Sequence, residues 1–221
     1  AYYGDVVEAL EIFAADSLLF EPGTRYLYST YGWNLISAIL QGATGKPYLQ
    51  VMQEEVIEPL SLHETIAEHV DSIIPWRARF YLPAEDEGQV VNAPFVDNSN
   101  KWAGGGYLST ARDMARYGAA YLQPEGFLDT TIVELMWTPQ SLTDGTPTTY
   151  GIGWNHAVID DGRRRVWHTG GAMGGSTVLA LFPDEGVVVS VLTNIRSARP
   201  IKVADAVSRH FTRVAQGSPT P

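Results

Sequence analysis

The sequence predicts an α+β fold, with an antiparallel sheet flanked by helices and a further helical region. Apolar residues recur at helical spacing in several segments of the first 149 residues. From Tyr150 onward the pattern changes to short β-rich runs separated by turn residues. No internal repeat, linker or low-complexity segment interrupts the 221 residues, so residues 1–221 are predicted to belong to one domain.

The helices of the first part follow from the apolar spacing and from the residues that end each segment. Gly45 and Pro47 follow one helix, and Pro59 follows another, as expected for helix ends. Thr110 precedes a further helix, with Asp113 at capping-box spacing. The predicted helices cover residues 5–15, 31–43, 48–57, 111–122 and 130–136. Residues 62–100 are irregular and polar, apart from a short hairpin of 77–82 against 90–93.

The second part predicts an antiparallel meander. Asp160-Asp161-Gly162 and Pro183-Asp184-Glu185-Gly186 have the composition of hairpin connections. The last two runs are continuously apolar, which predicts central strands covered on both faces. The predicted strands are residues 150–154, 164–168, 177–182 and 187–193. An amphipathic helix over 201–214 closes the fold.

Composition excludes several classes of function. The 25 acidic and 15 basic residues give a net charge of -10, which argues against nucleic acid and anionic membrane surfaces as partners. No run approaches the roughly 18 apolar residues of a transmembrane segment. The absence of cysteine excludes disulfides, thiolate zinc sites and a cysteine nucleophile. The first five residues carry no targeting signal.

Two segments combine hydroxyl groups, a histidine and glycines in a way that suits a catalytic cleft. Tyr28-Ser29-Thr30 stands just before a predicted helix, where its simpler interpretation is helix capping. His168-Thr169-Gly170-Gly171 ends a predicted strand, and its glycines let a ligand approach backbone N–H groups that can stabilise an oxyanion. The simpler interpretation of the second segment is a glycine-rich bulge with a surface histidine.

A third segment, Trp102–Gly106, carries three consecutive glycines. The glycines either let the backbone pack closely beside a cleft or form a flexible loop before the next helix. The five histidines form no HExxH motif, and no G-x-S-x-G, P-loop or dinucleotide-binding fingerprint occurs. The sequence therefore predicts neither a metal site nor an organic cofactor.

Taken in order, the segments resemble the motifs of the penicillin-recognising serine hydrolases, which are S-x-x-K, S-D-N and K-T-G. The resemblance is to the branch related to class C β-lactamases (peptidase S12 type), in which Y-x-N replaces S-D-N. Tyr28-Ser29-Thr30 takes the second position and His168-Thr169-Gly170 takes the third. The resemblance implies a β-lactamase/transpeptidase-like fold.

Further segments are similar to the mitochondrial serine β-lactamase-like proteins and their bacterial relatives. These segments are Arg77–Tyr81, Val96–Gly106, Met136–Pro139 and 168–172, and the similarity spans most of 17–195. Such relatives imply an exported, periplasmic or mitochondrial location, and the sequence leaves the compartment open.

Two motif positions depart from the wider family. Thr30 stands in place of the Y-x-N asparagine, and His168 stands in place of the K-T-G lysine. Both departures resemble the mitochondrial branch, and they place β-lactam hydrolysis in question. A histidine is cationic for only part of its population near neutral pH, so it holds a carboxylate less firmly than lysine does.

The S-x-x-K motif occurs nowhere in this sequence. The three lysines, 46, 101 and 202, are preceded at the required spacing by Ala43, Asn98 and Arg199. The resemblance places the motif on a helix upstream of residue 1. We therefore expect this sequence to be the carboxy-terminal majority of a catalytic domain that needs its missing amino-terminal segment and is inactive alone.

The resemblance implies a role for each motif residue. Tyr28 shares the general-base role with the absent lysine, which requires a depressed phenol pKa. The N–H of Gly171 donates to the oxyanion. Thr30 contacts the acyl amide, while His168, Thr169 and Gly170 hold a carboxylate or polar end of the substrate. No cofactor is implied.

Two hypotheses remain open at this point. In the first, the parent protein is a serine hydrolase that cleaves an amide or ester in a small-molecule or peptide substrate. In the second, it is a degenerate binding or scaffold protein without a nucleophile. A homo-oligomer is compatible with either hypothesis.

Overall fold

A computed structural model describes residues 2–86, 88–123 and 126–215. The chain divides into two compact units, and each is described by itself. Unit 1 comprises residues 1–77, 94–110 and 142–144, and unit 2 comprises 78–93, 111–141 and 145–221.

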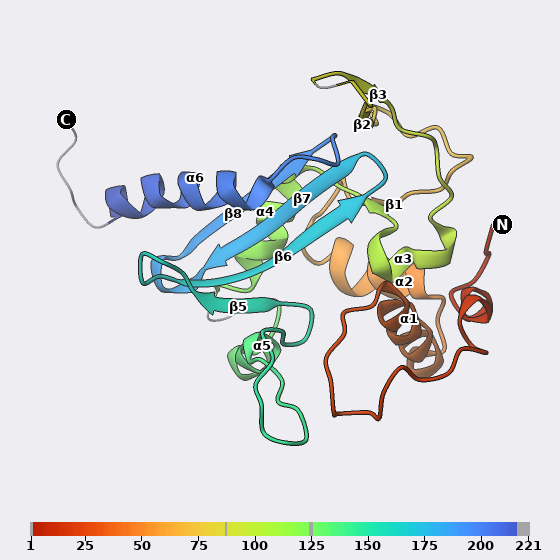
Figure 1. The fold of residues 1–221 in the computed structure, drawn as a ribbon, viewed down its shortest axis with the longest axis horizontal. Helices are drawn as coiled ribbons and strands as arrows, with labels where there is room; N and C mark the ends of the chain where they lie inside the picture. The colour runs from red at the N-terminus through yellow and green to blue at the C-terminus, as the bar shows by residue number, and fades with distance from the viewer. Residues whose placement is uncertain (1, 87, 124–125, 216–221) are drawn as a thin grey trace. The chain divides into compact units, whose positions relative to one another are not determined.

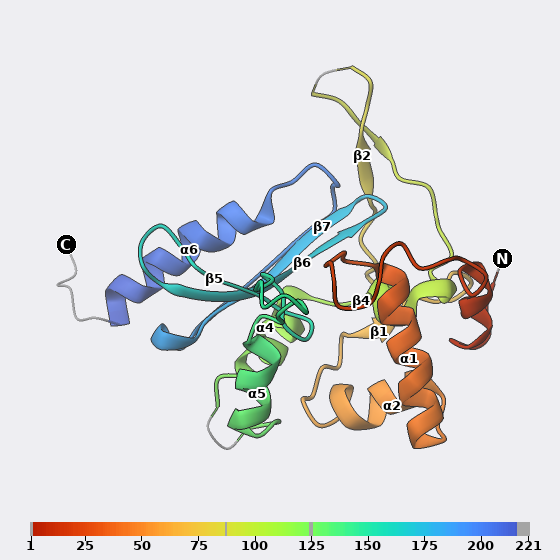
Figure 2. The ribbon, with the colours of Figure 1, turned by 60° about the horizontal axis from the view of Figure 1, so that its bottom comes forward.

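Unit 1 is built from short helices and one small antiparallel pair of strands. Its helices are α1 (Thr30–Thr44), α2 (Tyr48–Met52), which continues as a π-helical turn (Gln53–Ile57), and α3 (Trp102–Gly105). Two 3-10 helices (Glu8–Ile12 and Ser99–Lys101) and the paired strands β1 (Ile66–Ala67) and β4 (Tyr107–Leu108) complete the unit. Figure 2 shows α1 and α2 side by side.

The predicted helices of unit 1 are largely confirmed. Gly45 ends α1 in the left-handed conformation (φ 68°) and donates its N–H to the Gln41 carbonyl at 2.9 Å. The helix predicted over 5–15 is wrong in type and length, because only Glu8–Ile12 is regular and it is a 3-10 helix. Val6, Tyr48 and Trp102 form the buried centre of the unit.

Unit 2 contains a four-stranded antiparallel sheet in the order β5-β6-β7-β8. The strands are β5 (Asn155–Val158), β6 (Arg164–Ala172), β7 (Gly175–Phe182) and β8 (Val187–Thr193). Both predicted hairpin connections are confirmed, and Gly162 (φ 82°) and Gly186 (φ 66°) supply the positive φ that each turn requires.

Helices cover both faces of this sheet. They are α4 (Ala111–Ala120) and α5 (Thr130–Trp137) on one face and α6 (Pro200–Ala215) on the other (Figures 1 and 2). Alternate residues of β7 point to opposite faces. Val178, Ala180 and Phe182 pack with Ala204 of α6, whereas Leu179 and Leu181 pack in the cluster that includes α4 and α5 residues. The α+β architecture predicted from the sequence is confirmed.

Two details of the predicted sheet are wrong. Residues 150–154 form a turn rather than a strand, because Gly153 has positive φ (81°) and the Gly151 backbone lies against the Met136 carbonyl at the end of α5. The second error concerns β8, which lies at an edge of the described sheet and not at its centre. Its continuous apolar sequence reflects the helices on its two faces.

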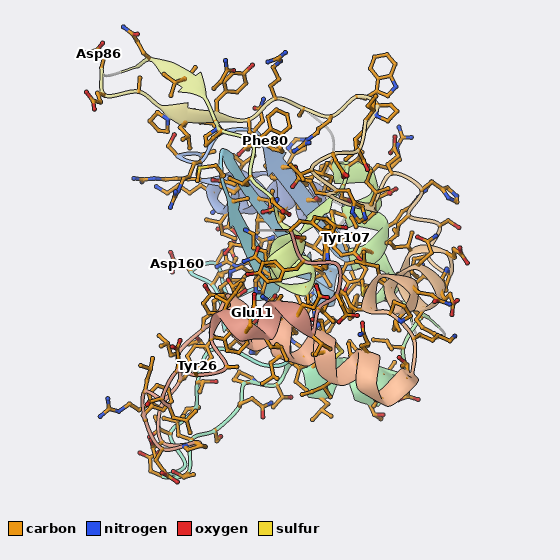
Figure 3. All side chains as sticks on the ribbon, turned by 90° about the vertical axis from the view of Figure 1, so that its right-hand side faces the viewer. Glu11, Tyr26, Phe80, Asp86, Tyr107 and Asp160 are labelled. Atoms are coloured by element: carbon orange, nitrogen blue, oxygen red, sulfur yellow. The ribbon has the colours of Figure 1, made fainter. Side chains whose placement is uncertain are left out.

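A small hairpin of unit 2 extends from the β6–β7 end of the sheet. It pairs β2 (Tyr81–Pro83) with β3 (Val90–Asn92), and Figure 3 labels Phe80 at its base and Asp86 near its tip. A Cβ on Gly174, which has positive φ, would lie 2.6 Å from the Phe80 side chain, so this close approach needs glycine. Among the described residues, no helix is both long and apolar enough to cross a membrane.

Candidate active site

The Tyr28-Ser29-Thr30 motif stands at the amino-terminal end of α1. Ser29 is the N-cap residue, and its Oγ accepts a hydrogen bond from the Gly32 N–H at 3.4 Å. The capping interpretation is therefore confirmed for Ser29. Thr30 begins the helix, and the Tyr28 side chain precedes it with 44% of its surface exposed.

The pKa of Tyr28 bears on its expected role as a general base. Partial burial raises the pKa of its phenol above the usual value, because burial disfavours the charged phenolate. A general base needs the opposite shift. The shift of the Tyr28 pKa is therefore opposite in direction to the one expected from the sequence.

The glycine segment packs directly on the first turn of α1. A Cβ on Gly104 would lie 2.4 Å from Thr30 Cγ2 and 3.2 Å from the Thr30 carbonyl, so only glycine fits there. Below it, buried Asn34 donates its Nδ2 to the Asn100 carbonyl at 2.5 Å. The structure thus brings the second motif and the three-glycine segment together, and the flexible-loop interpretation of Gly104 is wrong.

A buried polar network holds the glycine segment in place. The Glu68 carboxylate accepts a hydrogen bond from Asn98 Nδ2 at 2.6 Å and forms an ion pair with Arg77. Its backbone N–H donates to the Gly106 carbonyl at 2.8 Å. The Arg77 guanidinium also stacks on the Phe95 ring. Sequence reasoning missed Glu68, although its partners Arg77 and Asn98 both lie in segments that carry the family resemblance.

The His168-Thr169-Gly170-Gly171 motif lies on β6, where it pairs with β7 along its whole length. The other edge of β6 pairs with β5 only as far as Trp167. Beyond Trp167, no strand of the described chain pairs with that edge. An oxyanion site on a strand requires such an edge, where a neighbouring strand does not take up the backbone N–H groups.

His168 contacts a tyrosine that sequence reasoning did not select. The Tyr150 hydroxyl lies 3.0 Å from His168 Nε2, and the two rings meet edge to face. Burial lowers the pKa of His168, and a hydrogen bond with the Thr169 backbone partly opposes that effect. At neutral pH the imidazole is therefore mainly uncharged.

Thr169 faces away from His168, because successive side chains of a strand alternate between its faces. Thr169 and Gly170 line a cavity of about 270 Å³ together with Thr177, Arg199 and Lys202 at the start of α6. A Cβ on Gly171 would meet nothing within 4 Å, so its surroundings are open. The structure does not bring His168 and Thr169 together on one face.

Tyr28 and Thr30 belong to unit 1, whereas His168, Thr169, Gly170 and Gly171 belong to unit 2. Each motif is therefore described within its own unit. The signal that could have revealed Tyr150 is its place in a glycine-rich turn (Tyr150–Gly153), where a large buried side chain needs a specific partner. Within the described residues, no three potential His, Asp or Glu ligands are grouped for a metal ion.

Comparison with known proteins agrees with this architecture. Residues 1–211 match the sequence profile of the family described as Beta-lactamase. The human mitochondrial serine beta-lactamase-like protein LACTB is 34% identical over 94% of this chain and 44% of its own length. A D-aminopeptidase of Gluconobacter oxydans is 25% identical over 94% of this chain and 38% of its own length.

Solved structures share the fold. The octameric penicillin-binding protein homologue from Pyrococcus abyssi superposes with a TM-score of 0.78 at 24% identity, covering 94% of this chain and 47% of that one. A penicillin-binding protein from Bacillus halodurans gives a TM-score of 0.77 at 22% identity, covering 95% of this chain and 64% of that one. The chain spans under half the length of the curated relatives named above.

The profile match extends over nearly the whole sequence and includes both motif segments. The LACTB match adds a relative at more than 30% identity over almost the whole chain. These hydrolase relatives and the α+β fold lead to one assignment: the chain belongs to the Beta-lactamase family.

Proposed function

We propose that the protein containing these residues is a serine hydrolase that cleaves a peptide amide or an ester through an acyl-enzyme. The observation that carries the proposal is that the β5 ladder on β6 ends at Trp167, so that no described strand of unit 2 pairs with this edge beside Gly170 and Gly171. A strand edge of this kind can align an extended substrate and direct a backbone N–H at its carbonyl oxygen.

The proposed reaction has two halves. A serine Oγ attacks the substrate carbonyl carbon, and its proton passes to a base. The tetrahedral oxyanion accepts hydrogen bonds from the Gly171 N–H and from the N–H of the nucleophile itself. Collapse expels the amine or alcohol, which takes the proton. Water then attacks the acyl-enzyme, releasing a carboxylic acid and restoring the serine.

The nucleophile and its lysine are proposed to come from residues outside these 221. Support comes from the absence of S-x-x-K in the sequence and from the match to only 44% of the LACTB relative. The lysine ammonium would also lower the pKa of the Tyr28 phenol, offsetting the effect of its partial burial. Tyr28 would then relay the serine proton.

Thr30 is proposed to contact the acyl portion of the substrate from the start of α1. Gly170 and Thr169 lie beside the cavity that contains Arg199 and Lys202, which suits a polar or acidic end of a substrate. The D-aminopeptidase relative acts on peptides by its name, which favours an amide as the scissile bond.

A covalent probe tests this proposal. A fluorophosphonate is incubated with this chain and with a version extended upstream through a Ser-x-x-Lys helix, and intact masses are measured. We expect one adduct on the extended protein, none on this chain, and loss of the adduct when the upstream serine is changed to alanine. A Gly42→Ala variant of the extended protein, altered on the exposed side of α1, serves as the control and keeps the adduct.

The second hypothesis, a degenerate binding protein, follows from the same absence of S-x-x-K in this sequence. A folded extended protein that takes no probe and hydrolyses neither a peptide amide nor an ester would favour it. Losing nucleophile and base together removes the covalent route, whatever remains of the oxyanion site.

A further inference from the structure

Helix α1 is amphipathic in the reverse sense to an ordinary surface helix. A surface helix normally turns its apolar side chains to the core and its polar side chains to water. In α1 the fully buried side chains are Asn34 and Ser37, and both are polar. Four apolar side chains of the helix are instead 40% to 59% exposed, namely Leu35, Ile36, Ile39 and Leu40. No described residue therefore covers the apolar side of α1.

These four residues form one continuous surface, which we call the α1 apolar face. Leu35 and Ile39 are four positions apart, as are Ile36 and Leu40, so the members of each pair are neighbours on the helix surface. The two pairs make two adjacent rows of leucine and isoleucine. Rows of this kind are the ridges into which the side chains of a second helix pack. The α1 apolar face therefore suits another helix.

The opposite side of α1 is already held by unit 1. Asn34 Nδ2 donates to the Asn100 carbonyl at 2.5 Å, and Gln41 Nε2 donates to Asp5 Oδ2 at 2.6 Å. The Oε1 atom of Gln41 accepts a hydrogen bond from the Tyr48 N–H at 3.0 Å. A rotation of α1 that buried its apolar face would break these hydrogen bonds. The face is therefore directed outward by contacts that the sequence of unit 1 itself provides.

We propose that the α1 apolar face is the docking surface for the helix of the parent protein that carries the S-x-x-K motif. The choice of this helix rests on the proposed hydrolase function, which needs a serine and a lysine beside Tyr28. Tyr28 directly precedes α1. A helix that lies along the face and extends about two turns beyond Leu35 reaches the level of Tyr28. Docking would thus align the nucleophile with the second motif.

Length and charge favour this occupant. The match covers 44% of human LACTB, so more than half of that relative lies outside it. Residues three positions apart lie on one side of a helix, so S-x-x-K is a helical motif, and a helix of a globular domain needs an apolar neighbour. The net charge of -10 argues against an anionic membrane. A second copy of this chain is the competing occupant, and cross-linking distinguishes the two.

Thiol labelling tests whether the face is covered, and it requires no activity. The 221 residues contain no cysteine, and any cysteine upstream is first changed to serine. Ile39→Cys and Val158→Cys are made separately in the extended protein, because these two side chains are 59% and 69% exposed in this chain. We expect Ile39→Cys to react about a hundredfold more slowly than Val158→Cys, since a covered thiol reacts only when the helices separate. Similar rates would overturn the proposal.

Photochemical cross-linking identifies what covers the face. A photoreactive amino acid replaces Ile39 in the extended protein, and the peptides joined to it after irradiation are identified by mass spectrometry. We expect a product with the mass of one chain, in which position 39 is joined to a peptide upstream of residue 1 that contains Ser-x-x-Lys. A cross-link between two chains would assign the face to a second copy. That result, a cross-link to another upstream peptide, or no cross-link would each overturn the proposal.

Fluorophosphonate labelling connects docking with the proposed reaction. Ile39→Asp in the extended protein should lower the rate of adduct formation about tenfold or more, because it places a carboxylate in an apolar contact. Val158→Asp is the control and should keep the rate. An unchanged rate in Ile39→Asp would contradict the proposal, and if this variant does not fold, the labelling and cross-linking results decide. An extended protein that forms the expected cross-link and takes no probe counts against the hydrolase function and leaves the docking intact, so the two failures are distinguishable.

Discussion

The motifs of unit 1 and of unit 2 are held in place by different kinds of interaction. In unit 1 the Tyr28-Ser29-Thr30 motif depends on short helices, a glycine contact and a buried ion pair. In unit 2 the His168 motif lies on a long strand between two apolar clusters. The motif of unit 1 therefore depends on a few polar and close-packed contacts. The motif of unit 2 depends on apolar packing that is spread over many side chains.

The largest effect is expected at the buried carboxylate of unit 1. Glu68→Ala leaves the Arg77 guanidinium buried without its ion-pair partner, which costs about 3–5 kcal/mol. Hydrogen exchange followed by mass spectrometry should show lost protection in unit 1 peptides. Glu54→Ala removes an exposed ion pair with Lys46, which water screens, and should leave the stability of unit 1 nearly unchanged. Equal effects of the two variants would contradict the claim that the buried Glu68–Arg77 ion pair holds unit 1 together.

A comparable loss in unit 2 requires a core side chain. Leu181 is fully buried in β7, and Leu181→Ala should cost about 2–5 kcal/mol through lost burial and a residual cavity. The urea midpoint measures the loss. Val158→Ala on β5 is the control, since Val158 is 69% exposed, and a midpoint as low as that of Leu181→Ala would refute the assignment of the core.

A smaller effect is expected when one methyl group is added at Gly104, beside the Tyr28-Ser29-Thr30 motif. Gly104→Ala places a Cβ against Thr30 and should cost about 1–3 kcal/mol by overpacking. Gly42→Ala lies in α1 with open space around it, and should instead stabilise by about 0.5–1 kcal/mol through helix propensity. Thermal unfolding measures both effects: the melting temperature should fall in Gly104→Ala and rise in Gly42→Ala. Destabilisation by both would mean that glycine matters here for backbone freedom alone.

The smallest effect concerns pH in unit 2. Because burial lowers the pKa of His168, the unfolded chain takes up its proton first as pH falls below about 6.5. Stability is therefore full above that pH and declines as pH falls toward the folded pKa. The difference in urea midpoint between wild type and His168→Gln isolates the effect from His156, whose pKa is also lowered. A difference that moves in favour of wild type on acidification would contradict the sign.

Regular elements were predictable from sequence, and long-range geometry was not. The helix predicted over 31–43 is observed as Thr30–Thr44, and both hairpins of the sheet follow their turn residues. The sequence predicts a strand at 150–154, because the aromatic and apolar residues there have high β propensity. The positive φ of Gly153, which makes the segment a turn, cannot be recognised from the sequence.

The site was predictable only as separate segments. The family motifs predict Tyr28, Thr30 and residues 168–171 as site residues, and that remains a prediction. The contact of Tyr150 with His168, 18 positions away, is made through a turn that no local pattern encodes. Glu68 was missed for the same reason, because a buried carboxylate is recognisable only once Arg77 and Asn98 are placed around it.

The contact between Gly104 and Thr30 also shows that the glycine run can be required for the fold, and not only for catalysis. A glycine that is needed to let two backbones meet is retained for as long as the fold is retained, with or without chemistry. A descendant that had lost its nucleophile would still carry the glycine run and the hydroxyl motif that it touches. In relatives of this chain, the glycine run and the hydroxyl motif therefore report an inherited fold, and they do not by themselves report catalysis.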